Sequence, residues 1–162
     1  MLSTLETLQE EASDNGIGIE IHKLSGDMKG FYYSSTITSP SITIDLSVRT
    51  QKEETCIMAE ELGHHYTSYG NLILEKMDKY IVRKQEEQAK RWAVYRLVRI
   101  DDFIKAFKVG VHNKYEVAEY LDITEEFLDK TIEVYYRKYG ICKRIDDWVI
   151  YFNPFGFMRM DF

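Results

Sequence analysis

The chain has 162 residues, of which 44% are hydrophobic and 30% are charged, which is typical of a folded globular protein and excludes a disordered chain. No apolar run approaches the roughly 18 residues that a membrane-spanning helix needs. The 27 acidic residues outnumber the 21 basic ones, and the net charge of -6 argues against a general nucleic-acid binder, which needs a basic surface.

The start of the chain and its cysteines favour a cytoplasmic protein. The segment from Met1 to Gly16 lacks the basic and apolar regions of a secretory signal. Cys56 and Cys142 are too few for a disulfide framework, and we expect them to be reduced. We therefore expect a protein of the cytoplasm with no membrane partner.

A helix, three strands and a second helix are predicted first along the chain. Apolar residues at helical spacing predict a helix over residues 2–12. Alternating β-branched and aromatic residues predict three short strands within residues 17–48, which we expect to form a small antiparallel sheet. Thr50 and Glu53 have the spacing of a capping box, so a helix should begin there and run to about Tyr69.

The next part of the chain is predicted to be helical. Residues 71–79 fit either a short helix or a loop. Apolar periodicity then predicts a long helix over residues 80–98. A shorter helix should follow, with Asp101 or Asp102 as its N-cap.

Two further helices and a strand complete the predicted elements. Asn113 and Thr124 are the expected N-caps of the two helices, and Gly140 is expected to end the second one. The aromatic and β-branched run over residues 148–152 predicts a final strand. Together these elements predict an α+β fold, with one domain boundary near residues 100–112.

The helix predicted after Thr50 carries a pattern that points to metal chemistry. Glu60 and His64 are four residues apart and therefore project from one face, with Glu61 beside them. This is the geometry of an HExxH helix, in which the first and fifth positions hold zinc and the second acts on the metal-bound water. A carboxylate at the first position also binds zinc. The alternative interpretation is a solvated helix surface.

Two neighbouring features support a site. Gly63 lies inside the helix at a cost of about 0.5–1 kcal/mol, which indicates a close approach to its backbone by a ligand or by another helix. Glu86, Ala89 and Ala93 share one face of the next helix. The two alanines would let that face pack closely, so Glu86 can reach a metal held by the first helix.

These residues resemble the ImmA/IrrE family of metallo-endopeptidases, and in particular its phage and mobile-element members, in which an AEELGH form replaces HExxH. The likeness lies in AEELGH from Ala59 to His64, in the ExxAxxWA motif from Glu86 to Ala93, and in the segment Lys29 to Tyr32. It implies an α+β fold in which a small antiparallel sheet packs on zincin-like helices. It also implies a metallopeptidase-like domain over residues 1–105 and a helical, helix-turn-helix-like module with a C-terminal strand over residues 106–162.

The resemblance also implies a site. Glu61 becomes the general base, while Glu60, His64 and Glu86 become the ligands of zinc or another divalent metal. The chain departs from the wider family at Glu60, where the family has histidine. A second register, with Glu61 and His65 as ligands, is open but would remove Glu61 as the base.

The oxyanion-stabilising donor is open among His65, Tyr66 and Tyr69. By resemblance, the substrate is a helix-turn-helix repressor of the same phage or mobile element, and its cleavage relieves repression. The alternative is a catalytically silent regulator that binds protein or DNA through its C-terminal helices. Direct DNA binding is disfavoured because residues 114–139 hold seven acidic and four basic residues, a net charge of -3.

Overall fold

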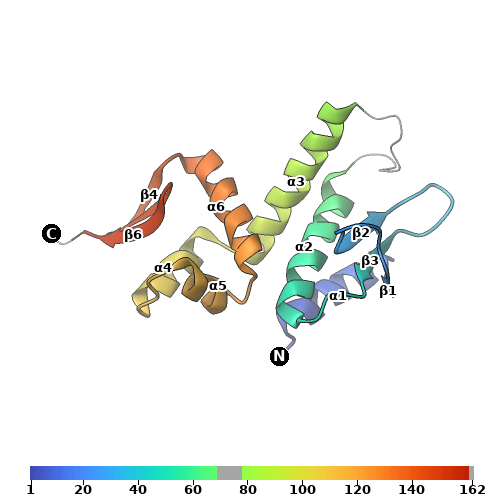
Figure 1. Cartoon of the computed structure of the whole chain (residues 1–162), viewed down its shortest axis with the longest axis horizontal. Helices are drawn as coiled ribbons and strands as arrows, with labels where there is room; N and C mark the ends of the chain where they lie inside the picture. Colours follow the sequence, from blue (N-terminus) through green and yellow to red (C-terminus); the bar gives the residue numbers. More distant parts are fainter. Residues whose placement is uncertain (69–77, 161–162) are drawn as a thin grey trace. The chain divides into compact units, whose positions relative to one another are not determined.

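The structure is a computed structural model that describes residues 1–68 and 78–160 (Figure 1). The chain forms two compact units, Met1–Ala93 and Val94–Phe162. The expected domains, with their boundary at residue 105, stay a prediction, because compactness alone does not establish which part folds independently. Within the described ranges, no helix is both long and apolar enough to cross a membrane.

The first unit is built from helices around a small sheet. Local signals fix where its helices begin: the Ser3 side chain accepts a hydrogen bond from the backbone N–H of Glu6, and the Thr50 side chain accepts one from Glu53. A sixth element, α3, begins in this unit and ends in the second. The elements are α1 (Thr4–Asp14), β1 (Gly18–His22), β2 (Gly30–Tyr33), β3 (Ser41–Asp45), α2 (Gln51–Thr67) and α3 (Lys79–Leu97).

The sheet of the first unit has the order β1-β3-β2, and its pairing corrects the sequence prediction. β2 is antiparallel to β3 as expected, but β1 is parallel to β3, so the predicted all-antiparallel sheet is wrong at this strand. Short connections make successive strands alternate in direction. Because β3 lies between β1 and β2, the first and third strands become neighbours, and these run the same way.

One face of this sheet packs against α1 and α2. In the register, Tyr32 of β2 lies opposite Ile42 of β3, and both side chains are buried. In the strand order β1-β3-β2, β2 is an edge strand, and it lies beside α2. The core between sheet and helices contains Leu5, Leu8, Ala12, Tyr32, Ile42, Ile44, Met58, Ala59 and Leu62.

Asp45, at the end of β3, is a buried carboxylate that ties two loops together. It accepts hydrogen bonds from the hydroxyl and the backbone N–H of Ser47, and from the backbone N–H of Leu24 at 2.6 Å. The Ser47 hydroxyl and these two backbone donors hold the pKa of Asp45 well below its usual range. The carboxylate therefore fixes the segment after β1 against the turn that leads to α2.

The second unit combines helices with an antiparallel sheet of order β4-β5-β6. The sequence predicts only the middle strand. Asn113 and Thr124 cap their helices as expected, whereas the preceding helix begins after Arg99 and not at an aspartate. The elements are α4 (Ile100–Lys108), α5 (Lys114–Leu121), α6 (Glu125–Tyr139), β4 (Cys142–Ile145), β5 (Trp148–Phe152) and β6 (Phe155–Arg159).

Aromatic side chains form the core of the second unit. The Phe107 and Phe157 rings stack with their centroids 3.7 Å apart, and Phe103 packs edge-on against Tyr135. The Tyr135 hydroxyl donates a 2.7 Å hydrogen bond to the carbonyl of Val98. The helices and small sheets of the two units confirm the predicted α+β fold. The resemblance of α5 and α6 to a helix-turn-helix module stays a prediction.

Candidate metal centre

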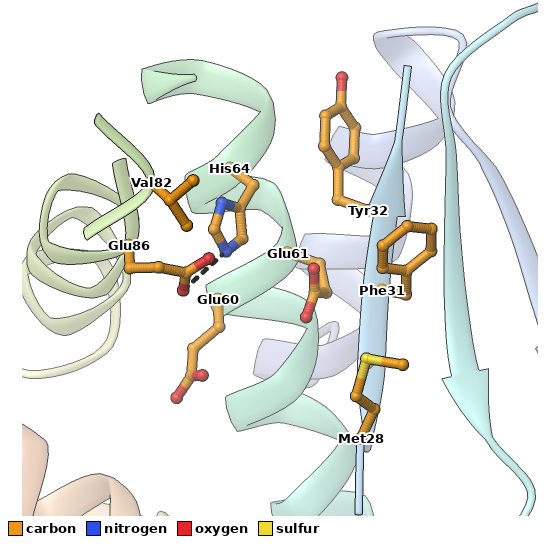
Figure 2. Close-up of a pocket in the computed structure, with 9 residues that line it drawn as sticks. Met28, Phe31, Tyr32, Glu60, Glu61, His64, Val82 and Glu86 are labelled. Atoms are coloured by element: carbon orange, nitrogen blue, oxygen red, sulfur yellow. Dashed lines mark ion pairs between the residues drawn. The ribbon is translucent and has the colours of Figure 1, made fainter. Parts of the chain in front are cut away.

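A pocket of about 420 Å³ lies in the first unit where β2, α2 and α3 meet (Figure 2). α2 contributes Glu60, Glu61 and His64, because their spacing places them on the side of the helix that faces β2 and α3. α3 contributes Glu86. The pocket is lined by Met28, Gly30, Phe31, Tyr32, Glu60, Glu61, His64, Val82 and Glu86.

His64 and Glu86 face one another across this pocket. The His64 Nε2 lies 3.5 Å from a Glu86 carboxylate oxygen, and Figure 2 shows this ion pair between α2 and α3. Burial of His64 by itself lowers the pKa of the imidazole. The hydrogen bond to Glu86 and the nearby carboxylates outweigh it and raise that pKa above its usual value. The structure thus brings together two of the three predicted ligands.

Glu60, the third predicted ligand, is placed differently. It lies one helical turn before His64, but Figure 2 shows its carboxylate directed away from the His64–Glu86 pair. Over residues 1–68 and 78–160, no group of three or more His, Cys, Asp or Glu side chains is arranged to hold a metal. Because Glu60 and His64 are one helical turn apart, the predicted ligand set requires a different rotamer of Glu60.

The Glu61 carboxylate lies against the backbone of β2. A Cβ built on Gly30 would be 2.6 Å from Glu61 Oε1 and 2.4 Å from a methyl group of Ile57, so a side chain at this position would displace Glu61 or Ile57. Burial raises the pKa of Glu61 to about 7, with His64 opposing the shift and the Glu60 and Glu86 carboxylates adding to it. The backbone N–H of Tyr32 also bonds Glu61 and favours its charged form.

Gly63 brings α2 and α3 together. A Cβ at this residue would lie 2.5 Å from the carbonyl oxygen of Ala89, so the helix backbones approach more closely than any side chain would allow. Of the two explanations for Gly63, helix–helix packing is the one that the structure supports. The close approach holds α3 where Glu86 reaches His64.

His65 points to β2. Its Nδ1 is hydrogen-bonded to the Tyr32 hydroxyl at 2.9 Å, and the two rings pack edge-on with centroids 5.6 Å apart. Burial lowers the pKa of His65 and so disfavours the charged form of its imidazole. This contact joins α2 to the edge strand and gives no support to the register in which His65 binds metal.

The other candidate oxyanion donors lie elsewhere. The Tyr66 hydroxyl donates to Glu11 of α1 and accepts from Asn15, and its ring stacks on Trp92. Tyr66 therefore joins α1, α2 and α3 and does not line the pocket described above. Tyr69, like most of the ambiguous segment 71–79, falls outside the described residues. The oxyanion donor stays open.

The sequence matches the IrrE N-terminal-like domain, a peptidase family, over residues 12–133. The chain belongs to the ImmA/IrrE family of metallopeptidases. No curated protein matches it in sequence. The family assignment confirms the resemblance inferred from the AEELGH and ExxAxxWA motifs.

Membership of the ImmA/IrrE family implies a divalent metal, in general zinc. The donor set of this family member fits such an ion, because one imidazole and two carboxylates are all common zinc ligands. The facing pair of His64 and Glu86 supports the fit, and Glu60 shares their side of α2. The roles of Glu60, His64 and Glu86 as ligands stay a prediction.

Two lining residues of this ImmA/IrrE-family pocket, Met28 and Val82, are absent from the sequence interpretation, and Phe31 appears in it only as part of the segment Lys29 to Tyr32. Met28, Phe31 and Val82 form apolar parts of its wall. A signal for Val82 was present, since it stands four residues before Glu86 on the same helix face. Nothing in the sequence distinguishes Met28 from an ordinary loop residue.

Proposed function

We propose that this chain is a zinc-dependent endopeptidase that cleaves a helix-turn-helix repressor and so relieves repression of a phage or mobile element. Family membership supports the metallopeptidase class. The repressor substrate follows from the resemblance of the AEELGH helix to family members of phages and mobile elements.

One observation carries the proposal. Glu61 is held by β2 on one side and lies next to the His64–Glu86 pair on the other, within a single open pocket. A general base needs both a fixed position and a pKa near the working pH. The packing against Gly30 supplies the first, and burial acts toward the second by raising the pKa of Glu61 above its usual value.

The chemistry of the protein residues follows from this arrangement. His64 and Glu86, with Glu60, would hold the metal, which when bound lowers the pKa of a water and polarises the substrate carbonyl. Glu61 takes a proton from the attacking water while the oxygen of that water bonds to the carbonyl carbon of the substrate. When the C–N bond breaks, Glu61 returns that proton to the leaving amine. The Tyr32 backbone N–H orients the carboxylate throughout.

The test is co-expression with a helix-turn-helix repressor of the same phage or mobile element, followed by immunoblotting for repressor fragments. Wild-type protein should cleave the repressor, whereas Glu61→Gln should leave it intact while keeping bound zinc. His64→Ala should lose both cleavage and zinc. His22→Ala, at an exposed histidine of β1 outside the pocket, is the matched control and should behave as wild type.

The outcomes separate the proposal from its alternative. An intact repressor with zinc-loaded wild type under inducing conditions defeats the peptidase hypothesis. Relief of repression by both wild type and Glu61→Gln, without fragments, would instead favour a catalytically silent regulator that binds its partner.

A further inference from the structure

β1 is the second edge strand of the sheet in the first unit, and all five of its residues are exposed. In the order β1-β3-β2, one side of β1 pairs with β3. Within residues 1–68 and 78–160, no strand pairs with the other side, which is the open edge of β1. An open edge offers its backbone groups to a strand of another molecule.

The hydrogen bonds of β1 determine which of its backbone groups point to the open edge. The N–H of Gly18 and the carbonyl of His22, at the two ends of the strand, bond to backbone groups just before and just after β3. In a strand, residues that bond one neighbour alternate with residues whose N–H and C=O point the other way. Ile19 and Ile21 therefore present their backbone groups to the open edge.

The side chains of Ile19 and Ile21 add apolar surface to this edge. They stand beside Ile42 and Ile44 of β3 and so point to the face of the sheet that packs on the helices. Ile42 and Ile44 are buried there, whereas Ile21 keeps 62% of its surface exposed. The helices of the first unit therefore leave this end of β1 uncovered, with room for the side chains of a neighbouring strand.

We propose that the open edge of β1 pairs with β1 of a second copy of this chain. The two strands run antiparallel about a two-fold axis at Ile21, and the two three-stranded sheets join into one continuous sheet. The two Ile21 residues then exchange both backbone hydrogen bonds, with their Cα atoms about 5.5 Å apart. Their exposed side chains cover one another on the helix-packed face.

Charge selects this register among those that the backbone groups allow. An axis at Ile21 places Glu20 of each copy directly opposite His22 of the other, so opposite charges face each other twice. An axis at Glu20 would set two carboxylates opposite each other, and like charges in that position are destabilising. An axis at His22 would bring two imidazoles together, and an axis at Ile19 would set Glu20 against the uncharged Gly18.

The same two side chains already interact within one strand. The His22 Nε2 lies 3.4 Å from a Glu20 carboxylate oxygen, and both side chains are exposed. Pairing about Ile21 would extend this contact to a cluster of two carboxylates and two imidazoles on the outer face of the joined sheet. The strand is thus complementary to itself in hydrogen-bonding groups, in apolar surface and in charge.

The pairing leaves the candidate metal centre accessible. That pocket is at β2, the opposite edge of the sheet, so both pockets stay open in the dimer. The inference therefore goes beyond the proposed peptidase function and does not depend on it. An edge of five residues buries less area than a standard protein interface, so we expect a reversible dimer that forms at high protein concentration.

The first experiment measures the dimer dissociation constant of the zinc-loaded full chain by sedimentation velocity over a range of protein concentrations. Ile21→Lys should weaken dimerisation by at least about tenfold, because two ammonium groups would face each other at the axis. Ile37→Lys is the matched control, because Ile37 is 93% exposed between β2 and β3, and it should dimerise as wild type does. Circular dichroism melts check that each variant is folded.

Exchanging the two charges tests the register. Glu20→Lys sets two cations opposite each other and His22→Glu sets two carboxylates opposite each other, so each alone should weaken dimerisation by several-fold. The double variant Glu20→Lys with His22→Glu restores opposite charges and should recover the wild-type dissociation constant. An axis at Glu20 gives no such recovery, because position 20 would still face its own copy.

A disulfide test measures the position of the axis directly. All variants carry Cys142→Ser, because Cys142 is an exposed thiol. Ile21→Cys should form a covalent dimer on mild oxidation, because a Cα separation of about 5.5 Å lies within the range of disulfides. Ile19→Cys is the control on the same face of the strand and should stay monomeric on a non-reducing gel.

The results either support the pairing or overturn it. It is overturned by a wild-type chain that stays monomeric at every concentration, by an Ile21→Lys variant that dimerises as wild type does, and by a double charge variant that does not recover. Cross-linking through Ile19→Cys in place of Ile21→Cys also overturns it, because it moves the axis. Cleavage of the repressor is measured separately with Glu61→Gln, so failure of the dimer leaves the proposed function standing.

Discussion

Replacing Gly63 by alanine tests the helix packing on which the site depends. The new Cβ would lie 2.5 Å from the Ala89 carbonyl oxygen, whereas unstrained contacts begin near about 3.5 Å. α2 and α3 would therefore separate by about 1 Å. Overpacking of this kind costs about 1–3 kcal/mol, and the better helix propensity of alanine recovers about 1 kcal/mol. We expect the free energy of unfolding to fall by as much as about 2 kcal/mol.

The assay is urea denaturation followed by circular dichroism, with zinc affinity measured on the folded protein. Gly18→Ala in β1 is the control, because a Cβ there meets nothing within 4 Å and the stability should change by less than about 0.5 kcal/mol. Since the His64–Glu86 pair spans the same two helices, Gly63→Ala should also weaken zinc binding by about tenfold. If Gly63→Ala were as stable as Gly18→Ala and bound zinc as wild type does, the reasoning about this packing would be refuted.

Three further predictions concern single residues. Gly30→Ala should reduce repressor cleavage by about 100-fold with the fold retained, because its Cβ displaces the Glu61 carboxylate; cleavage at the wild-type rate would contradict this. The folded-state pKa of Asp45 is lowered, so its stabilisation is present above the unfolded pKa of about 3.9 and is lost as pH falls. At pH 7, Asp45→Asn should thus have a lower melting temperature than wild type, and the melting temperatures of the two proteins should converge as the pH is lowered. Tyr135→Phe should lower the free energy of unfolding by about 1 kcal/mol in urea titrations, because it leaves the buried Val98 carbonyl without its donor.

Helix positions could be predicted because their signals are local. The Thr50, Asn113 and Thr124 side chains each accept a hydrogen bond from a backbone N–H three residues ahead, and this spacing is readable directly from the sequence. The start of the helix before Asn113 was harder to predict. Its two aspartates suggest a cap, but the N-cap is Arg99, and Asp102, three residues after it, accepts a hydrogen bond from the backbone N–H of Arg99.

Strand pairing was harder to predict because direction depends on distant neighbours. Alternation located β1 and β3 but carried no information on whether they pair in parallel, which follows from the insertion of β3 between the other two strands. β6 was missed although Phe155 and Phe157 alternate with Gly156 and Met158. A segment of four or five residues gives too short a pattern to separate a strand from a tail.

At the candidate site, too, features with a local sequence signal could be predicted and features that depend on distant contacts could not. The helix spacing predicted that His64 and Glu86 would meet, and the conformational cost of Gly63 predicted the close approach that lets them do so. The direction of the Glu60 side chain could not be predicted, because a position on a helix face leaves several rotamers open. The role of Gly30 depends on a contact between β2 and α2, elements that are distant in the chain, and no local pattern encodes it.

The bond between Tyr32 and Glu61 also has a consequence for solubility. β2 is an edge strand, and an exposed edge offers free backbone groups on which a strand of another molecule can align. The Tyr32 amide is already occupied by the carboxylate, so a second molecule that docks along β2 meets an interrupted row of donors. The side chain proposed as the general base therefore also occupies one backbone donor of this edge.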